Sequence, residues 1–69
     1  MNKWKIEIIL NSGKELTVYY KGYEVNSTDV CKQVVGGGEN TFNGFSNEDG
    51  TGNVLIKVGE IAAMTIYAG

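Results

Sequence analysis

Residues 3–20 have the sequence KWKIEIILNSGKELTVYY, and this stretch decides the fold. Apolar side chains occupy every second position over residues 4–10, and lysine and glutamate fill most of the positions between them. The same period of two returns over residues 16–20, and the Asn, Ser and Gly of residues 11–13 are typical of a turn. The stretch therefore predicts an antiparallel β-hairpin with one apolar and one polar face.

A short helix is predicted after the hairpin. The side chains of residues 26–29 (Asn, Ser, Thr and Asp) all favour a helix N-terminus. Cysteine and valine then recur at helical spacing as far as Gly36, which stands where a glycine often ends a helix. We expect a helix over residues 28–35, with a strand as the alternative because valine is β-branched.

Two bulges are expected in the strands on either side of this helix. Lys21-Gly22 interrupts the alternation, and we expect Tyr23 and Val25 to continue the strand beyond it. Residues 41–46 predict a further strand, with a bulge at Asn43-Gly44 because its two phenylalanines have an odd separation.

Glycine-rich loops separate the remaining strands. Residues 36–40 form a loop, and residues 47–53 contain the Asp-Gly that is typical of a hairpin turn. A strand over residues 54–58 follows. The final strand, residues 61–67, is apolar on both faces apart from Thr65. One face carries Ile61, Ala63 and Tyr67, and the other carries Ala62, Met64 and Ile66.

Together these elements predict one domain over residues 1–69, mostly β in class (α+β): a small antiparallel sheet or a partly open barrel of about five strands. A chain of this size buries only about 60% of its unfolded surface, so disulfides, metals or partner subunits usually add stability. One cysteine and no histidine exclude the first support and argue against the second. A homo-oligomer is therefore expected, with Ala62, Met64 and Ile66 as its interface.

The charge balance bears on the partner and the compartment. Eight acidic residues against six lysines, with no arginine, give a net charge of −2. Without guanidinium groups or a basic stripe, nucleic acid is not the expected partner. No apolar run is long enough to cross a bilayer and the first residues show no signal peptide, so no membrane association is expected. The lone thiol suits a reducing compartment, and we expect a cytoplasmic protein.

Each candidate catalytic group lacks a partner. Cys31 has no histidine to act as its base, so a structural thiol is the expected role. Glu48 and Asp49 are adjacent on a turn and do not converge on one substrate. Residues 48–53 offer oxygen ligands without the spacing of a Ca²⁺-binding loop. The sequence therefore predicts a non-catalytic protein with no metal and no cofactor.

Tyrosines and one glycine loop are the candidate binding elements. Tyr19 and Tyr23 are expected to be partly exposed near Lys21, and tyrosines on the polar face of a sheet are typical interface anchors that also stack on nucleobases. The loop Gly37-Gly38-Glu39 is a connector that could close over a partner. The other aromatic residues are expected in the core: Trp4, Tyr20, Phe42, Phe45 and Tyr67.

Residues 53–67 have the sequence NVLIKVGEIAAMTIY, which carries a resemblance. The segment is similar to the closing strands of small SH3- or Sm-like proteins encoded by phages and mobile elements of Gram-positive bacteria. The resemblance covers residues 41–67 and rests on an apolar pattern, so it assigns no site residue. It implies a small antagonist of host defence.

Three functions follow. The first is a phage-type inhibitor of a host defence protein, such as a CRISPR nuclease, that acts by protein–protein contact as anti-CRISPR proteins do. The second is an oligomeric sponge that sequesters a cyclic nucleotide signal, with lysines neutralising its phosphates. The third is a structural or regulatory subunit whose last strand drives assembly.

Overall fold

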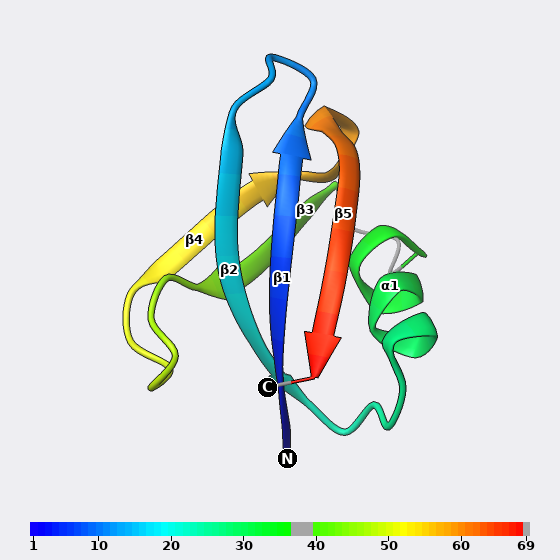
Figure 1. The fold of residues 1–69 in the computed structure, drawn as a ribbon, viewed down its shortest axis with the longest axis vertical. Helices are drawn as coiled ribbons and strands as arrows, with labels where there is room; N and C mark the ends of the chain where they lie inside the picture. Colours follow the sequence, from blue (N-terminus) through cyan, green and yellow to red (C-terminus); the bar gives the residue numbers. More distant parts are fainter. Residues whose placement is uncertain (37–39, 69) are drawn as a thin grey trace.

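The hairpin predicted from residues 3–20 forms the centre of the sheet in the computed structural model, which describes residues 1–36 and 40–68. One helix and a single-turn 3₁₀ helix accompany five strands in these residues (Figure 1). The elements in chain order are β1 Asn2–Leu10, β2 Glu15–Gly22, α1 Ser27–Gly36, β3 Thr41–Phe45, β4 Asn53–Lys57, η1 Val58–Glu60 and β5 Ile61–Ala68. The predicted fold class is confirmed.

The predicted hairpin of β1 and β2 is confirmed. Ile6 pairs with Val18, and the turn closes through a backbone hydrogen bond of 2.8 Å from the N–H of Leu10 to the carbonyl of Lys14. Gly13 has a φ of +90°, a conformation that costs glycine nothing. The composition of the turn therefore fixes the register, and the register fixes which side chains share a face.

The sheet is antiparallel, with the strand order β4-β3-β2-β1-β5. Strands β2, β1 and β5 form one layer, and β3 and β4 cross behind it (Figure 1). A single pair, Tyr19 with Phe45, joins β2 to β3, so the sheet bends sharply there. The two layers enclose the core between them.

Gly44 lets the two layers approach closely, and the bulge predicted at Asn43-Gly44 is wrong. The register of β3 with β4 is continuous, from Thr41 with Lys57 to Phe45 with Asn53. Gly44 faces inward, where a Cβ atom would lie 3.2 Å from the carbonyl oxygen of Tyr19. The odd separation of the phenylalanines therefore reflects a buried Phe42 and an outward, half-buried Phe45.

Helix α1 forms where the sequence places it, and the strand alternative is excluded. The side-chain oxygen of Asn26 accepts a hydrogen bond of 2.9 Å from the N–H of Asp29, which makes Asn26 the N-cap. Val30 and Val34 are buried on the inner side of the helix. The helix flanks β5 (Figure 1) and closes that side of the core.

The strand does not continue through Tyr23 and Val25, as the sequence suggested. Strand β2 ends at Gly22, and Tyr23 and Val25 are 84% and 78% exposed. The side-chain amide of Asn2 donates a hydrogen bond of 2.8 Å to the carbonyl of Glu24, which holds the segment between β2 and α1 to the start of β1.

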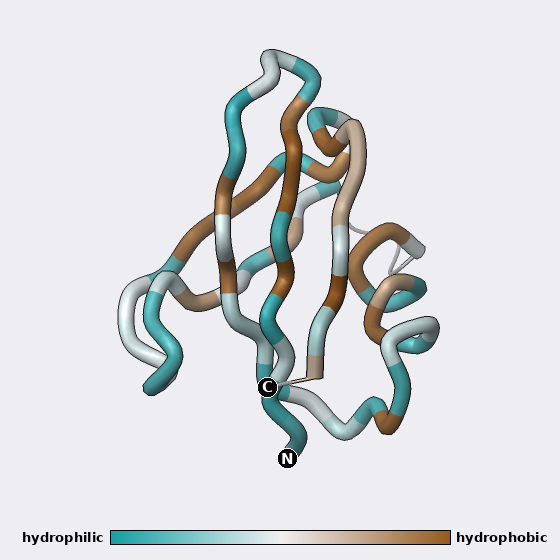
Figure 2. The backbone as a smooth tube through the Cα atoms, viewed as in Figure 1, coloured by the Kyte–Doolittle hydropathy of each residue, from teal (hydrophilic) through white to brown (hydrophobic). Residues whose placement is uncertain are grey.

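The core is apolar and joins both layers to the helix. Hydrophobic and hydrophilic positions alternate along β1 in Figure 2, as the period of two requires. The buried residues are Trp4, Ile6, Ile8, Val18, Val30, Val34, Phe42 and Ile56. None of the helices in the described residues is long and apolar enough to cross a bilayer.

Strand β5 differs from its predicted alternation at one position. Ile9 pairs with Ala63 but Leu10 pairs with Ile61, so Ala62 forms a bulge. The bulge turns Ile61 towards the core, whereas the sequence placed it on the face of Ala63 and Tyr67. Tyr67 itself is 46% exposed and is not a core residue, in contrast to the prediction.

Candidate functional site

The candidate site lies on the outer face of the β2–β1–β5 layer, the side turned away from the core. The strand register arranges the side chains of this face in rows, because alternate residues of each strand point outward. From the N-terminal end of β1 the rows are Lys3 with Lys21; Lys5 between Tyr19 and Tyr67; Glu7 between Thr17 and Thr65; and Ile9 between Glu15 and Ala63. The first two rows carry lysine, and the last two carry glutamate.

A cleft of about 320 Å³ opens on the two lysine rows, and we call it the lysine–tyrosine cleft. Strands β1 and β2 supply most of its lining, and the β3–β4 loop and the end of β5 complete it. The lining residues are Lys3, Trp4, Lys5, Tyr19, Tyr20, Lys21, Glu48 and Ala68. Small-molecule sites span about 300–1,000 Å³, so this cleft can hold a small ligand or one end of a larger one.

The cleft is cationic although the protein is acidic. Three of its lining residues are lysines, against one carboxylate, Glu48. Lys5 and Lys21 are half-buried and Lys3 is exposed, and all three residues border the cleft. Charges of one sign gathered in a cleft raise the local concentration of ligands of the opposite sign.

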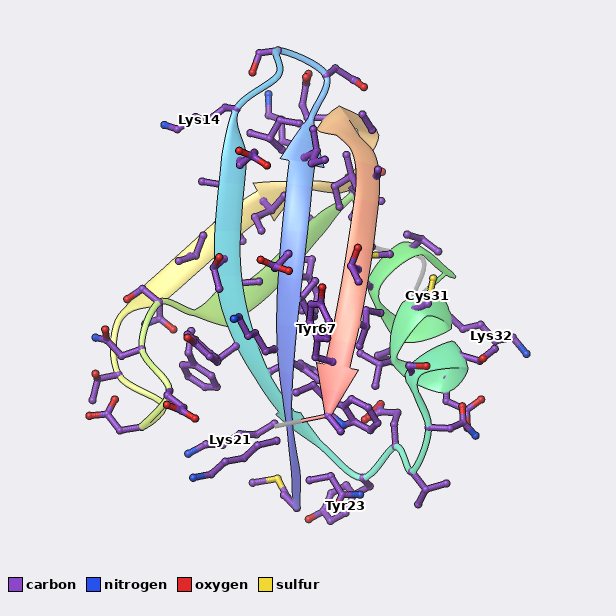
Figure 3. All side chains as sticks on the ribbon, in the orientation of Figure 1. Lys14, Lys21, Tyr23, Cys31, Lys32 and Tyr67 are labelled. Carbon is purple, nitrogen blue, oxygen red and sulfur yellow. The ribbon has the colours of Figure 1, made fainter. Side chains whose placement is uncertain are left out.

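Two tyrosines flank the central lysine. The Nζ atom of Lys5 lies 5.9 Å from the centroid of the Tyr67 ring, within the range of a cation–π contact. Figure 3 shows Tyr67 over the outer face, and the register places Tyr19 on the opposite side of Lys5. Hydrogen bonding to the Glu7 carboxylate, and then its charge, raises the pKa of the Tyr67 hydroxyl, which favours the neutral, donating form.

The β3–β4 loop, residues 46–52, forms a side wall that is held in place by its own hydrogen bonds. Asp49 Oδ1 accepts bonds of 3.0 Å from the N–H of Thr51 and 2.6 Å from its hydroxyl. Lys21 Nζ donates a bond of 3.4 Å to the Asp49 carbonyl. Gly50 has a φ of +86°, and a Cβ atom there would come within 2.6 Å of Lys21 Nζ. The side chain of Lys21 therefore lies against the loop at Gly50, whose positive φ favours glycine.

The carboxylate of Asp49 belongs to this turn rather than to a metal site. Hydrogen bonds from the Thr51 hydroxyl and backbone hold the pKa of Asp49 below its ordinary value of 3.8. Across residues 1–36 and 40–68, no three acidic or cysteine side chains gather closely enough to hold a metal ion.

Trp4 and Tyr20 link the cleft to the core. Tyr20 is tilted against Phe42, with ring centroids 5.7 Å apart, and its hydroxyl bonds to Glu24. Burial raises the pKa of the Tyr20 hydroxyl, and the Glu24 carboxylate raises it further. Trp4 is only 6% exposed, and its buried Nε1 finds no hydrogen-bond partner in the part of the chain that the structure describes.

The structure brings together two of the predicted binding residues and separates a third. Tyr19 and Lys21 line the cleft, whereas Tyr23 projects at the end of the molecule beyond it (Figure 3). Gly37, Gly38 and Glu39 lie outside the described residues. Sequence reasoning missed the first two lysines, although pairing β1 with β2 across the turn at residues 11–13 already places Lys3 opposite Lys21 and Lys5 opposite Tyr19.

Two of the three residues predicted as an oligomer interface lie on the inner side of β5. Met64 and Ile66 are half-buried and pack against the core, while Ala62 is exposed at the bulge. Together with Cys31 and two residues of the first turn of α1, Met64 and Ile66 line a groove of about 280 Å³. Helix α1 therefore covers part of the surface that the sequence assigned to a second subunit.

The residues of the lysine–tyrosine cleft suit binding. Ammonium groups are point charges for anionic ligands, and tyrosine rings stack on planar groups. No known protein-family model matches this chain, and neither a curated protein nor a solved structure shows significant similarity to it.

Proposed function

We propose that this chain is a non-catalytic binding domain whose lysine–tyrosine cleft takes a small nucleotide, with the phosphate on the lysines and the base against tyrosine. The observation that supports this most strongly is the convergence of Lys3, Lys5 and Lys21 around Tyr19 in one cleft of about 320 Å³. A nucleotide joins an anion to a planar ring, and the cleft joins the groups that bind each of them.

The absence of arginine limits the mode of binding without excluding it. Arginine binds phosphate through two parallel hydrogen bonds, whereas lysine binds it as a point charge, which gives attraction with less geometric selection. Stacking of a base on an aromatic side chain contributes about 1–3 kcal/mol and tolerates any base. We therefore expect selection for phosphate and a ring, with modest discrimination between bases.

Charge and size favour a short ligand over a long nucleic acid. The net charge of −2 and the glutamate rows above the cleft repel a polyanion that extends along the sheet. A mononucleotide, or one nucleotide unit of a cyclic di- or trinucleotide, presents few phosphates and suits a site of about 320 Å³. In a host cell, such a domain would act as a sponge for a nucleotide signal.

A second candidate is inhibition of a host defence protein by direct contact, and the exposed end of the molecule favours it. Asn2 pairs with Gly22, which brings Met1 to the end from which Tyr23 projects. Met1, Tyr23 and Val25 are 76%, 84% and 78% exposed, and we call them the apolar tip. Exposed tyrosine and methionine side chains anchor many protein contacts.

A thermal-shift panel tests the nucleotide proposal. Mononucleotides, cyclic dinucleotides and cyclic trinucleotides are added to the intact chain, and a ligand at 100 times its Kd should stabilise the fold by about 2.7 kcal/mol. Lys5→Gln, Lys21→Gln and Tyr19→Leu should each weaken the shift, and added salt should weaken it further. Lys14→Gln and Lys32→Gln remove the same charge from exposed positions outside the cleft and serve as matched controls.

The results separate the two candidates. If no nucleotide stabilises the chain, or the control variants lose the shift equally, the nucleotide proposal is wrong. Binding of a defence protein that is lost with Tyr23→Ala or Val25→Ser, and kept with Lys5→Gln, would support the apolar tip instead.

A further inference from the structure

The outer face of the β2–β1–β5 layer separates its charges along the strand direction. Lysines occupy the two rows nearest the N-terminal end of β1, and glutamates occupy the two rows nearest its C-terminal end. The fold of the hairpin does not require lysines at one end and glutamates at the other, because outward positions of an exposed strand accept either charge. The face therefore carries a pattern that a second copy of itself can match.

A two-fold axis that lies in the plane of the face, perpendicular to the strands, exchanges the rows. It places the first row of one copy on the fourth row of the other and the second on the third. Lys21 then faces Glu15 of the second copy, and Lys5 faces Glu7 of the second copy. Because the symmetry repeats each contact, a dimer of this kind contains both pairs twice.

The opposite arrangement is excluded by the same charges. A two-fold axis parallel to the strands would place each row on itself, with lysine on lysine and glutamate on glutamate. Like charges brought together across an interface disfavour a complex strongly, so the pattern selects one orientation of the second copy. The twist of stacked sheets tilts the rows, and the central Lys5–Glu7 pairs align best.

The uncharged residues of the face fit the same arrangement. Tyr19 meets Thr17 of the second copy, and Tyr67 meets Thr65 of the second copy, so aromatic rings lie on small side chains rather than on each other. Ile9 and Tyr67, which are 42% and 46% exposed in the single chain, would be covered. These contacts supply the apolar burial, while the ion pairs set the orientation.

We infer that this face is where two copies of the chain associate, with the lysine rows of each copy on the glutamate rows of the other. The inference answers the need of a short chain for a partner subunit. It places the contact on the outer side of the layer, whereas Met64 and Ile66 pack against the core on the other side. Lys5 and Lys21 also line the cleft, so a nucleotide and the second copy compete for them.

Variants that reverse the charges of Lys5 and Glu7 test the inference. Sedimentation equilibrium over a wide concentration range should show a dimer of the 7.5 kDa chain that weakens with salt. Lys5→Glu and Glu7→Lys should each raise the dimer Kd at least about tenfold, because each brings like charges together. The double variant K5E/E7K restores opposite charges at both contacts and should return the Kd to near the starting value. Lys32→Glu, on the exposed side of α1, should leave it unchanged.

The outcomes are decisive because circular dichroism first establishes that each variant is folded. A chain that stays monomeric at every concentration overturns the inference. So does a dimer that ignores the single reversals, or a double variant that fails to recover. K5E/E7K also loses a cleft lysine, so it should dimerise without binding a nucleotide. Failure of the nucleotide proposal therefore leaves the dimer test intact, and failure of the dimer leaves the nucleotide test intact.

Discussion

The hydroxyl oxygen of Tyr20 lies 3.1 and 3.0 Å from the two carboxylate oxygens of Glu24 and donates its hydrogen bond to them. Both residues are half-buried, Tyr20 within β2 and Glu24 two residues beyond its end, and Gly22 between them in the chain is buried. A Cβ atom at Gly22 would collide with both side chains, so the glycine is what allows the pair to form.

Tyr20→Phe should destabilise the fold by about 1 kcal/mol, the usual net value of one hydrogen bond that is partly screened by solvent. The ring keeps its contact with Phe42, so the loss reports the hydroxyl alone. Urea unfolding measures the change, and Tyr23→Phe at an exposed position is the control. If Tyr20→Phe and Tyr23→Phe change the free energy of unfolding equally, the Tyr20–Glu24 hydrogen bond contributes nothing to stability.

Stability should also fall at alkaline pH because of Tyr20. Burial and Glu24 raise the folded-state pKa of its hydroxyl above the ordinary 10.0. The folded state therefore holds this proton more tightly than the unfolded state. The contribution is fully present below pH 10 and is lost as the pH rises through the raised pKa. Glu24→Gln should lower the pKa of Tyr20, and phenolate absorbance measures the change. If all four tyrosines titrate together both in the unsubstituted chain and in Glu24→Gln, the raised pKa of Tyr20 is contradicted.

Gly44→Ala should destabilise the fold by about 1–3 kcal/mol, as overpacking of a core does. The added methyl would lie 3.2 Å from the backbone oxygen of Tyr19 and 3.3 Å from Val18 Cβ, and neither can move without shifting β2. Gly59→Ala meets no atom within 4 Å and is the matched control, with an expected change within about 0.5 kcal/mol. Similar unfolding midpoints for the two variants would contradict the close approach of β2 and β3.

The β3–β4 loop should loosen at acidic pH. Thr51 lowers the folded-state pKa of Asp49 below 3.8, so the contribution of this carboxylate to stability is present above that pH and is lost as the pH falls through the lowered pKa. Thr51→Val should raise the pKa of Asp49 towards 3.8, and Thr51→Ser, which keeps the hydroxyl, should not. A carbon-detected NMR titration measures both, and an unchanged pKa in Thr51→Val would contradict the hydrogen bond.

The sequence predicted those elements whose signals are local. Alternation and turn composition were enough for β1, β2 and the loop before β4, and the capping side chain of Asn26 was enough for the start of α1. The errors arise where a tertiary contact overrides the local pattern. Gly44 was interpreted as part of a bulge because the contact that requires a glycine there is made with β2, a different strand.

The side of the sheet on which Ile61 lies could not be predicted from the local pattern of β5 either. The bulge at Ala62 is set by pairing with β1, and it changes the side on which Ile61 lies. For the candidate site, Tyr19 and Lys21 were predicted from composition and alternation. Glu48 joins them only because the sheet bends at the Tyr19–Phe45 pair, a relation that no window of sequence contains.

The position of Trp4 gives the molecule an intrinsic optical reporter. It is the only tryptophan of the chain, it is almost fully buried, and it borders the cleft together with Tyr19 and Tyr20. Its fluorescence emission should therefore shift to longer wavelength on unfolding, and energy transfer from the adjacent tyrosines should change when the cleft is occupied. Folding, ligand binding and self-association can thus be followed in one unlabelled sample.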